Sequence, residues 1–207
     1  MSTVKRSLNE IFTTLRKTAI ASGYSHGVAE EIGRAGVWLC ARGQDGAGSV
    51  LAAMSAGHES PVTPRFEGAA AVFGPGQPAM AGLAALDLLL SGRDIQQVRF
   101  ETVDAPMLIA GLAGARARET GLAVIAEVGG VAENIAECDF ERIEQATAMT
   151  LFLGGRPVSV EGDEHIDGAE VGAAAWAACK KLAARTHVPA SEQSRIMGAG
   201  ANLTDND

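Results

Sequence analysis

The amino-acid sequence predicts an α+β fold of mixed type, in which an N-terminal helical hairpin precedes a small mixed sheet flanked by helices. Apolar residues recur at helical spacing over residues 7–43. Short runs rich in β-forming residues occur near residues 98–103, 122–128, 148–153 and 157–161. A hydrophobic content of 47% with 20% charged residues is typical of a globular protein and argues against wholesale disorder.

Helix-terminating signals define the N-terminal hairpin. Ser7 and Glu10 form a capping-box pattern at the start of the first helix. Gly23 fits the position just past the end of that helix, and Ser25 fits the N-cap of the next one. Gly43 then closes the second helix. These signals predict two antiparallel helices between residues 7 and 43.

The next segment alternates predicted elements with loops rich in proline and glycine. We expect a short helix over residues 49–56, a short strand over 70–73 and an Ala/Leu-rich helix over 78–90. That last helix has Pro78 at its start and Gly92 at its end, which is the usual asymmetry of helix termini.

The middle of the chain predicts a β-α-β unit. A strand at 98–103, a helix at 106–119 closed by Gly121, and a strand at 122–128 follow in that order. A parallel connection of this kind is expected to be right-handed. The acidic residues between Glu127 and Glu144 predict a further helix with a solvated face.

The C-terminal part predicts a hairpin of residues 150–153 and 158–160, an amphipathic helix over 170–185, and a short helix from Ser191. We expect a single domain over residues 1–207. Its parts are the helical hairpin (7–43), an α/β body (44–187) and a C-terminal tail (188–207).

Net charge and cysteine content limit which partners the protein is expected to bind and where in the cell it is expected to be. The net charge of −8 argues against nucleic acid as the main partner. No apolar run is long enough to predict a membrane span, and the best one, residues 80–90, contains Asp87. Three well-separated cysteines without a CxxC pattern predict reduced thiols and a cytoplasmic location.

Two sequence patterns suggest chemistry but lack the necessary context. Residues 23–27 match GxSxG, yet a nucleophile elbow needs a preceding strand, whereas this segment follows a helix. The acidic residues around His165 could bind a divalent cation, but their spacing fits no EF-hand and favours a solvated loop. No phosphate-binding loop is present. We therefore predict no metal site, and no cofactor is indicated.

Several segments together resemble a bacterial family of uncharacterised proteins, a domain of unknown function of about this length. The resemblance rests on residues 7–10, 29–43, 188–192, 198–201 and 203–207. This family implies no activity.

Residues 7–48 also resemble the N-terminal helices of the type-two malate/L-lactate dehydrogenases. In that family the helical hairpin ends in an Arg-Gly-x-Asp-Ser-His-Gly-like motif whose histidine is the catalytic acid. The matching stretch here runs from Arg42 to Gly48, and Ala47 stands where the histidine is expected. The resemblance therefore implies a related architecture without that proton donor.

Two functional hypotheses follow. The first is a non-catalytic small-molecule-binding or accessory subunit that forms a homo-oligomer or acts with a partner enzyme. Trp38 and Trp176 lie off the apolar stripes of their helices and so predict an interface. The alternative is an enzyme acting on a small carboxylate metabolite, with arginine pairing and a carboxylate base.

The candidate binding residues are those that the enzyme hypothesis singles out, with Arg42 or Arg195 pairing with the substrate carboxylate. They follow the helical hairpin or lie near the chain end, where the C-terminal carboxylates are either frayed or docked in a pocket. These residues are Arg42, Asp45, Ser191, Glu192, Arg195, Asp205 and Asp207.

Overall fold

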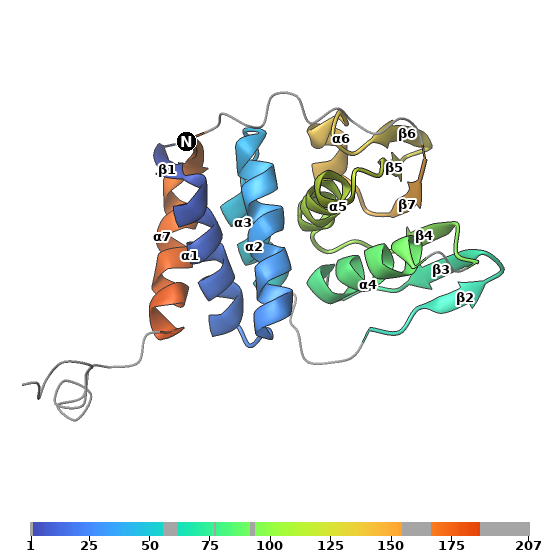
Figure 1. Ribbon diagram of the computed structural model, residues 1–207, viewed down its shortest axis with the longest axis horizontal. Helices are drawn as coiled ribbons and strands as arrows, with labels where there is room; N and C mark the ends of the chain where they lie inside the picture. Colours follow the sequence, from blue (N-terminus) through green and yellow to red (C-terminus); the bar gives the residue numbers. More distant parts are fainter. Residues whose placement is uncertain (1, 56–61, 77, 92–93, 155–166, 187–207) are drawn as a thin grey trace, which may run out of the picture.

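The structure, a computed structural model, describes residues 2–55, 62–76, 78–91, 94–154 and 167–186. A group of helices lies beside a second group that packs on a sheet (Figure 1). The first group comprises α1 (Leu8–Ala21), α2 (His26–Ala41), α3 (Gly46–Ser55) and α7 (Ala173–Ala183), the last ending in a 3₁₀ turn (Ala184–Thr186). The second comprises α4 (Pro78–Leu90), α5 (Pro106–Thr120) and α6 (Phe140–Glu144).

The predicted helical hairpin is confirmed in α1 and α2. The Ser7 Oγ accepts a hydrogen bond of 3.1 Å from the Glu10 backbone N–H, as the capping box requires. Gly23 and Gly43 follow the two helices with φ values of 97° and 74°, a region that favours glycine. The buried Thr18 hydroxyl lies 3.0 Å from the Cys179 carbonyl oxygen and so joins α1 to α7.

The main sheet has the strand order β2-β3-β4-β7-β5-β6. Among the described strands of this sheet, only the β3–β4 pair is parallel. The strands are β2 (Arg65–Glu67), β3 (Ala70–Phe73), β4 (Gln97–Phe100), β5 (Val124–Val128), β6 (Val131–Asn134) and β7 (Met149–Leu153). Together with the helices, this mixed sheet confirms the predicted α+β class.

The predicted β-α-β unit is present in a split form. β4 and β5 are both antiparallel to β7, which lies between them, so the two strands run in the same direction without pairing. Local sequence patterns could not show this, because the strand that separates them comes about twenty residues later in the chain.

One face of the sheet packs against α4 and α5. On this face the rings of Phe73 and Phe100 stack with centroids 5.5 Å apart, and Leu151 is completely buried. The opposite face carries the exposed side chains of Glu67, Gln97 and Glu127. No helix of the described residues covers this second face.

The structure adds one strand pair that was not predicted and corrects two predicted helices. Residues Thr3–Ser7 form β1 and pair antiparallel with β8 (Gly168–Gly172), a pairing that local patterns did not predict. The helix predicted from residue 170 therefore begins at Ala173. The acidic stretch is a β5–β6 hairpin followed by α6, because Gly129 and Gly130 adopt positive φ and turn the chain.

The two tryptophans are buried, contrary to the predicted exposure. Trp38 and Trp176 are each only 3% exposed. Trp38 packs edge-to-face on Phe140 with centroids 5.9 Å apart, and the Arg6 guanidinium lies 5.9 Å from the Trp176 ring. The tryptophan argument for an interface therefore fails.

Several predicted features lie outside the described residues. They are the strand predicted near 157–161, the acidic segment before Asp167, and the helix predicted from Ser191. The prediction that residues 150–153 form a hairpin with that strand is wrong, because β7 pairs with β4 on one edge and with β5 on the other. Within the described part of the chain, no helix has the length and apolar character needed to cross a membrane.

Candidate functional site

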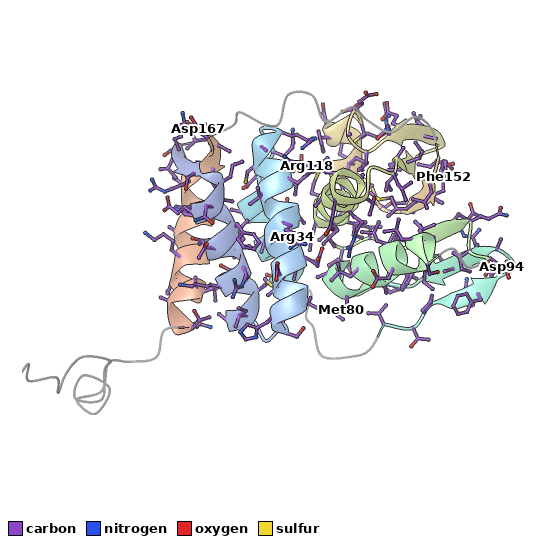
Figure 2. The ribbon with its side chains drawn as sticks, viewed as in Figure 1. Arg34, Met80, Asp94, Arg118, Phe152 and Asp167 are labelled. Atoms are coloured by element: carbon purple, nitrogen blue, oxygen red, sulfur yellow. The ribbon has the colours of Figure 1, made fainter. Side chains whose placement is uncertain are left out.

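A groove between α2 and α5 combines an apolar wall with charged side chains. It encloses about 470 Å³, within the range of roughly 300–1,000 Å³ that small-molecule sites occupy. In Figure 2, Arg34 and Arg118 both lie at the boundary between the two helices. The residues that line this α2–α5 groove are Phe12, Arg34, Val37, Trp38, Ala115, Arg118 and Glu119.

Glycine residues allow the helices to form the apolar wall. A Cβ atom at Gly114 would overlap the Trp38 indole, so only glycine lets α5 approach α2 this closely. A Cβ at Gly33 would lie 3.1 Å from the Phe12 ring, which packs tightly against α2. Trp38 and Phe12 are consequently fixed by close packing rather than free to reorient.

Ion pairs cross the rim of the groove. Arg34 on α2 pairs with Glu30 at 2.7 Å, Glu31 at 3.3 Å and Glu119 of α5 at 3.5 Å. Arg116 on α5 pairs with Glu119 at 3.3 Å and with Glu31 at 3.7 Å. Two of these pairs, Arg34–Glu119 and Arg116–Glu31, connect α2 to α5, and the others lie within one helix. Most of these side chains are partly exposed, so each pair contributes at most about 1 kcal/mol.

Arg42, a predicted site residue, does not line the groove but contacts Trp38, which does. Its guanidinium carbon lies 3.9 Å from the centroid of the Trp38 ring, and its Nη1 donates to the Trp38 carbonyl oxygen at 3.4 Å. This cation–π contact packs Arg42 onto one of the groove's own lining residues.

Asp45, the second predicted residue, caps α3. Its Oδ1 accepts a hydrogen bond of 2.9 Å from the Gly48 backbone N–H, and its carbonyl oxygen accepts one of 2.8 Å from the Ser49 hydroxyl. Asp45 also lines a separate pocket of about 200 Å³ with Asp104 and Glu144. Among the described residues, no group of three or more His, Cys, Asp or Glu side chains is arranged to hold a metal ion.

The remaining predicted site residues lie outside the described part of the chain: Ser191, Glu192, Arg195, Asp205 and Asp207. The structure therefore neither joins them to Arg42 nor separates them from it.

The three cysteines form no disulfide, as predicted, and all three are buried. Burial raises the pKa of the Cys40, Cys138 and Cys179 thiols to about 11. At neutral pH these thiols are therefore protonated, whereas a cysteine nucleophile acts as the thiolate.

The open face of the sheet carries two further hollows. They enclose about 680 Å³ and 350 Å³ and share Glu127 as a lining residue. Arg99, a cation at the second hollow, is paired with Glu67. Each hollow is lined by two glutamates and by at most one arginine, whereas the α2–α5 groove is lined by two arginines and one glutamate. This face is therefore less suited to an anionic ligand than the groove.

Sequence reasoning missed Arg34, Arg118 and Glu119. Arg34 follows Glu30 and Glu31 on α2, a pattern that indicates an exposed helical ion-pair face. The available signal was the pair of small residues Gly111 and Gly114 in α5, which permits close helix packing. It does not say which helix α5 packs against.

Comparison with known proteins places only part of the groove in a family. Residues 6–94 match the model of a family described as a protein of unknown function (DUF3726). No curated protein and no solved structure matches the chain. The matched region includes Phe12, Arg34, Val37, Trp38 and Arg42, whereas α5 lies outside it. It also includes the N-terminal segments on which the family resemblance was based, but not the C-terminal ones.

Proposed function

We propose that this protein binds a small carboxylate with an apolar body in the α2–α5 groove and does not transform it chemically. One observation carries the proposal: Arg34 and Arg118 line the same groove as an apolar wall that includes Val37 and Trp38. Guanidinium is the side-chain group best matched to a carboxylate, because it donates two parallel hydrogen bonds.

The apolar wall supports a ligand with a hydrocarbon part. Burying apolar surface contributes about 25 cal/mol per Å², while the two arginines supply orientation and selectivity for charge. A carboxylate with a short aliphatic or aromatic body matches both features. Hexanoate is a suitable probe, and hexanamide is a neutral molecule of nearly the same shape.

The chemistry of the lining residues favours binding over catalysis. General acid–base catalysis needs a side chain that can exchange a proton close to the substrate. Among the lining residues only Glu119 carries such a group, and its carboxylate is paired with Arg34 and Arg116. Arginine stays protonated and cannot act as a base.

The proposal is tested by hexanoate titration monitored through Trp38 fluorescence in a Trp176→Phe variant, which leaves Trp38 as the sole tryptophan. We expect saturable binding of hexanoate and much weaker binding of hexanamide. Arg118→Gln should weaken hexanoate binding while the far-UV circular dichroism stays unchanged. Equal binding of the acid and the amide, or no response to hexanoate, would contradict the proposal.

Mass spectrometry of the freshly purified full chain provides a second test, under native and then denaturing conditions. A carboxylate lost on denaturation, and recovered unchanged after long incubation with the protein, would agree with a binding role. Recovery of a chemically altered molecule would instead support the alternative of an enzyme acting on a small carboxylate.

A further inference from the structure

A carboxylate of the protein itself already occupies one side of the α2–α5 groove. Glu119 lines the groove, and one of its oxygens lies 3.5 Å from Arg34 Nη1. The other oxygen lies 3.3 Å from Arg116 Nη1. Arg34 thus lines the groove and is at the same time paired with a carboxylate of α5.

The position of Glu119 in its helix is unfavourable for a negative charge. Glu119 belongs to the last turn of α5, which ends at Thr120. The carbonyl groups at the end of a helix carry partial negative charge and favour cations such as Arg118, which lies in the same turn. The ion pairs to Arg34 and Arg116 therefore offset an intrinsic cost of placing a carboxylate here.

We propose that Glu119 is a built-in competitor for the ligand carboxylate and so limits the affinity of the groove for anions. This inference rests on the proposed binding of a small carboxylate. The Glu119 side chain is 50% exposed, so it can move away from Arg34 without disturbing the core. A ligand carboxylate takes the place of Glu119 at Arg34, whereas a neutral ligand leaves the Glu119–Arg34 pair intact.

Glu119 also lowers the affinity for anions, because its negative charge lies beside the position that the ligand carboxylate takes. Replacing Glu119 with glutamine removes this charge and keeps the shape of the side chain. We expect Glu119→Gln to bind hexanoate about two- to fivefold more tightly, the range set by a partly exposed charge pair. Added salt should reduce the difference, because it screens exposed charges.

Glu30→Gln is the matched control. Glu30 also pairs with Arg34, at 2.7 Å, but it does not line the groove. Both variants are made in the Trp176→Phe background and titrated with hexanoate and hexanamide. We expect the larger gain in hexanoate affinity for Glu119→Gln and no change in hexanamide binding for either variant. A purely structural role of Glu119 would not distinguish the acid from the amide.

The outcomes separate this inference from the function on which it rests. If hexanoate binds the protein but Glu119→Gln is no tighter, or Glu30→Gln gains as much, the competitor role is wrong while the binding function stands. If hexanoate binds neither the parent protein nor Glu119→Gln, the proposed function and this inference both fail.

Discussion

At the scale of single residues, Gly114 determines how closely α5 can approach the tryptophan of α2. A methyl group at this position would overlap the Trp38 indole. We therefore expect Gly114→Ala to lower the free energy of unfolding by about 1–3 kcal/mol, as overpacking of a core does. Urea unfolding followed by circular dichroism measures this loss.

Gly27→Ala is the control for Gly114→Ala, because Gly27 is also helical but nothing lies within 4 Å of its added Cβ. The same glycine-to-alanine change should there be neutral or stabilise the protein by up to about 1 kcal/mol. If Gly114→Ala is as stable as Gly27→Ala, the close packing of α5 on Trp38 is not as described.

Asp45 illustrates a residue whose sequence motif suggests ligand binding but whose side chain caps a helix. Asp45→Ala should lower the free energy of unfolding by about 0.5–2 kcal/mol, because the Gly48 N–H loses its acceptor. Asp45→Asn should restore most of that loss. Hexanoate affinity in the α2–α5 groove should stay the same in both variants, and a parallel loss of affinity would make Asp45 part of the binding site.

At the scale of helices and strands, the sequence predicted those elements whose signals are local. The Ser7 cap and the glycines after α1 and α2 act within a few residues, and they gave the hairpin correctly. The β1–β8 pairing joins Val4 to Val171 and has no local signal, because each strand gains its partner only on folding. The insertion of β7 between β4 and β5 was missed for the same reason.

The two faces of β7 provide a test of the sheet arrangement. Leu151 is completely buried against the helices, and its neighbour Phe152 points to the opposite, open face. Leu151→Ala should cost about 2–5 kcal/mol of unfolding free energy, since it leaves a cavity in the core. Phe152→Ala should cost clearly less, although phenylalanine is the larger side chain. Similar losses would mean that the second face is covered in solution.

At the scale of the whole molecule, the groove could not be predicted because its residues come from α1, α2 and α5. Periodicity identified each helix but not which helices become neighbours, and that choice depends on Gly111 and Gly114. Arg42 was identified from a motif, and it reaches the groove only through its contact with Trp38. The motif that singled out Arg42 therefore gave no signal for the cavity beside Trp38.

The three buried thiols make the free energy of unfolding of the whole protein sensitive to pH in the alkaline range. Burial raises the pKa of each thiol from 9.0 to about 11. Between these values the unfolded chain loses thiol protons that the folded protein retains, so the free energy of unfolding decreases as pH rises. This contribution is fully present below pH 9 and is lost as pH approaches 11. Burial also raises the pKa of Tyr24, which acts in the same direction above 10.0.

Chemical denaturation at several pH values between 9 and 11 measures this dependence. Each thiol contributes a slope of at most about 1.4 kcal/mol per pH unit. Cys138→Ala removes one of these protons, so its unfolding free energy should fall less steeply with pH than that of the parent protein. Changes in Tyr24 and in the lysines are common to both proteins and cancel in the comparison. Parallel slopes for the two proteins would show that Cys138 ionises as readily in the folded state as in the unfolded chain.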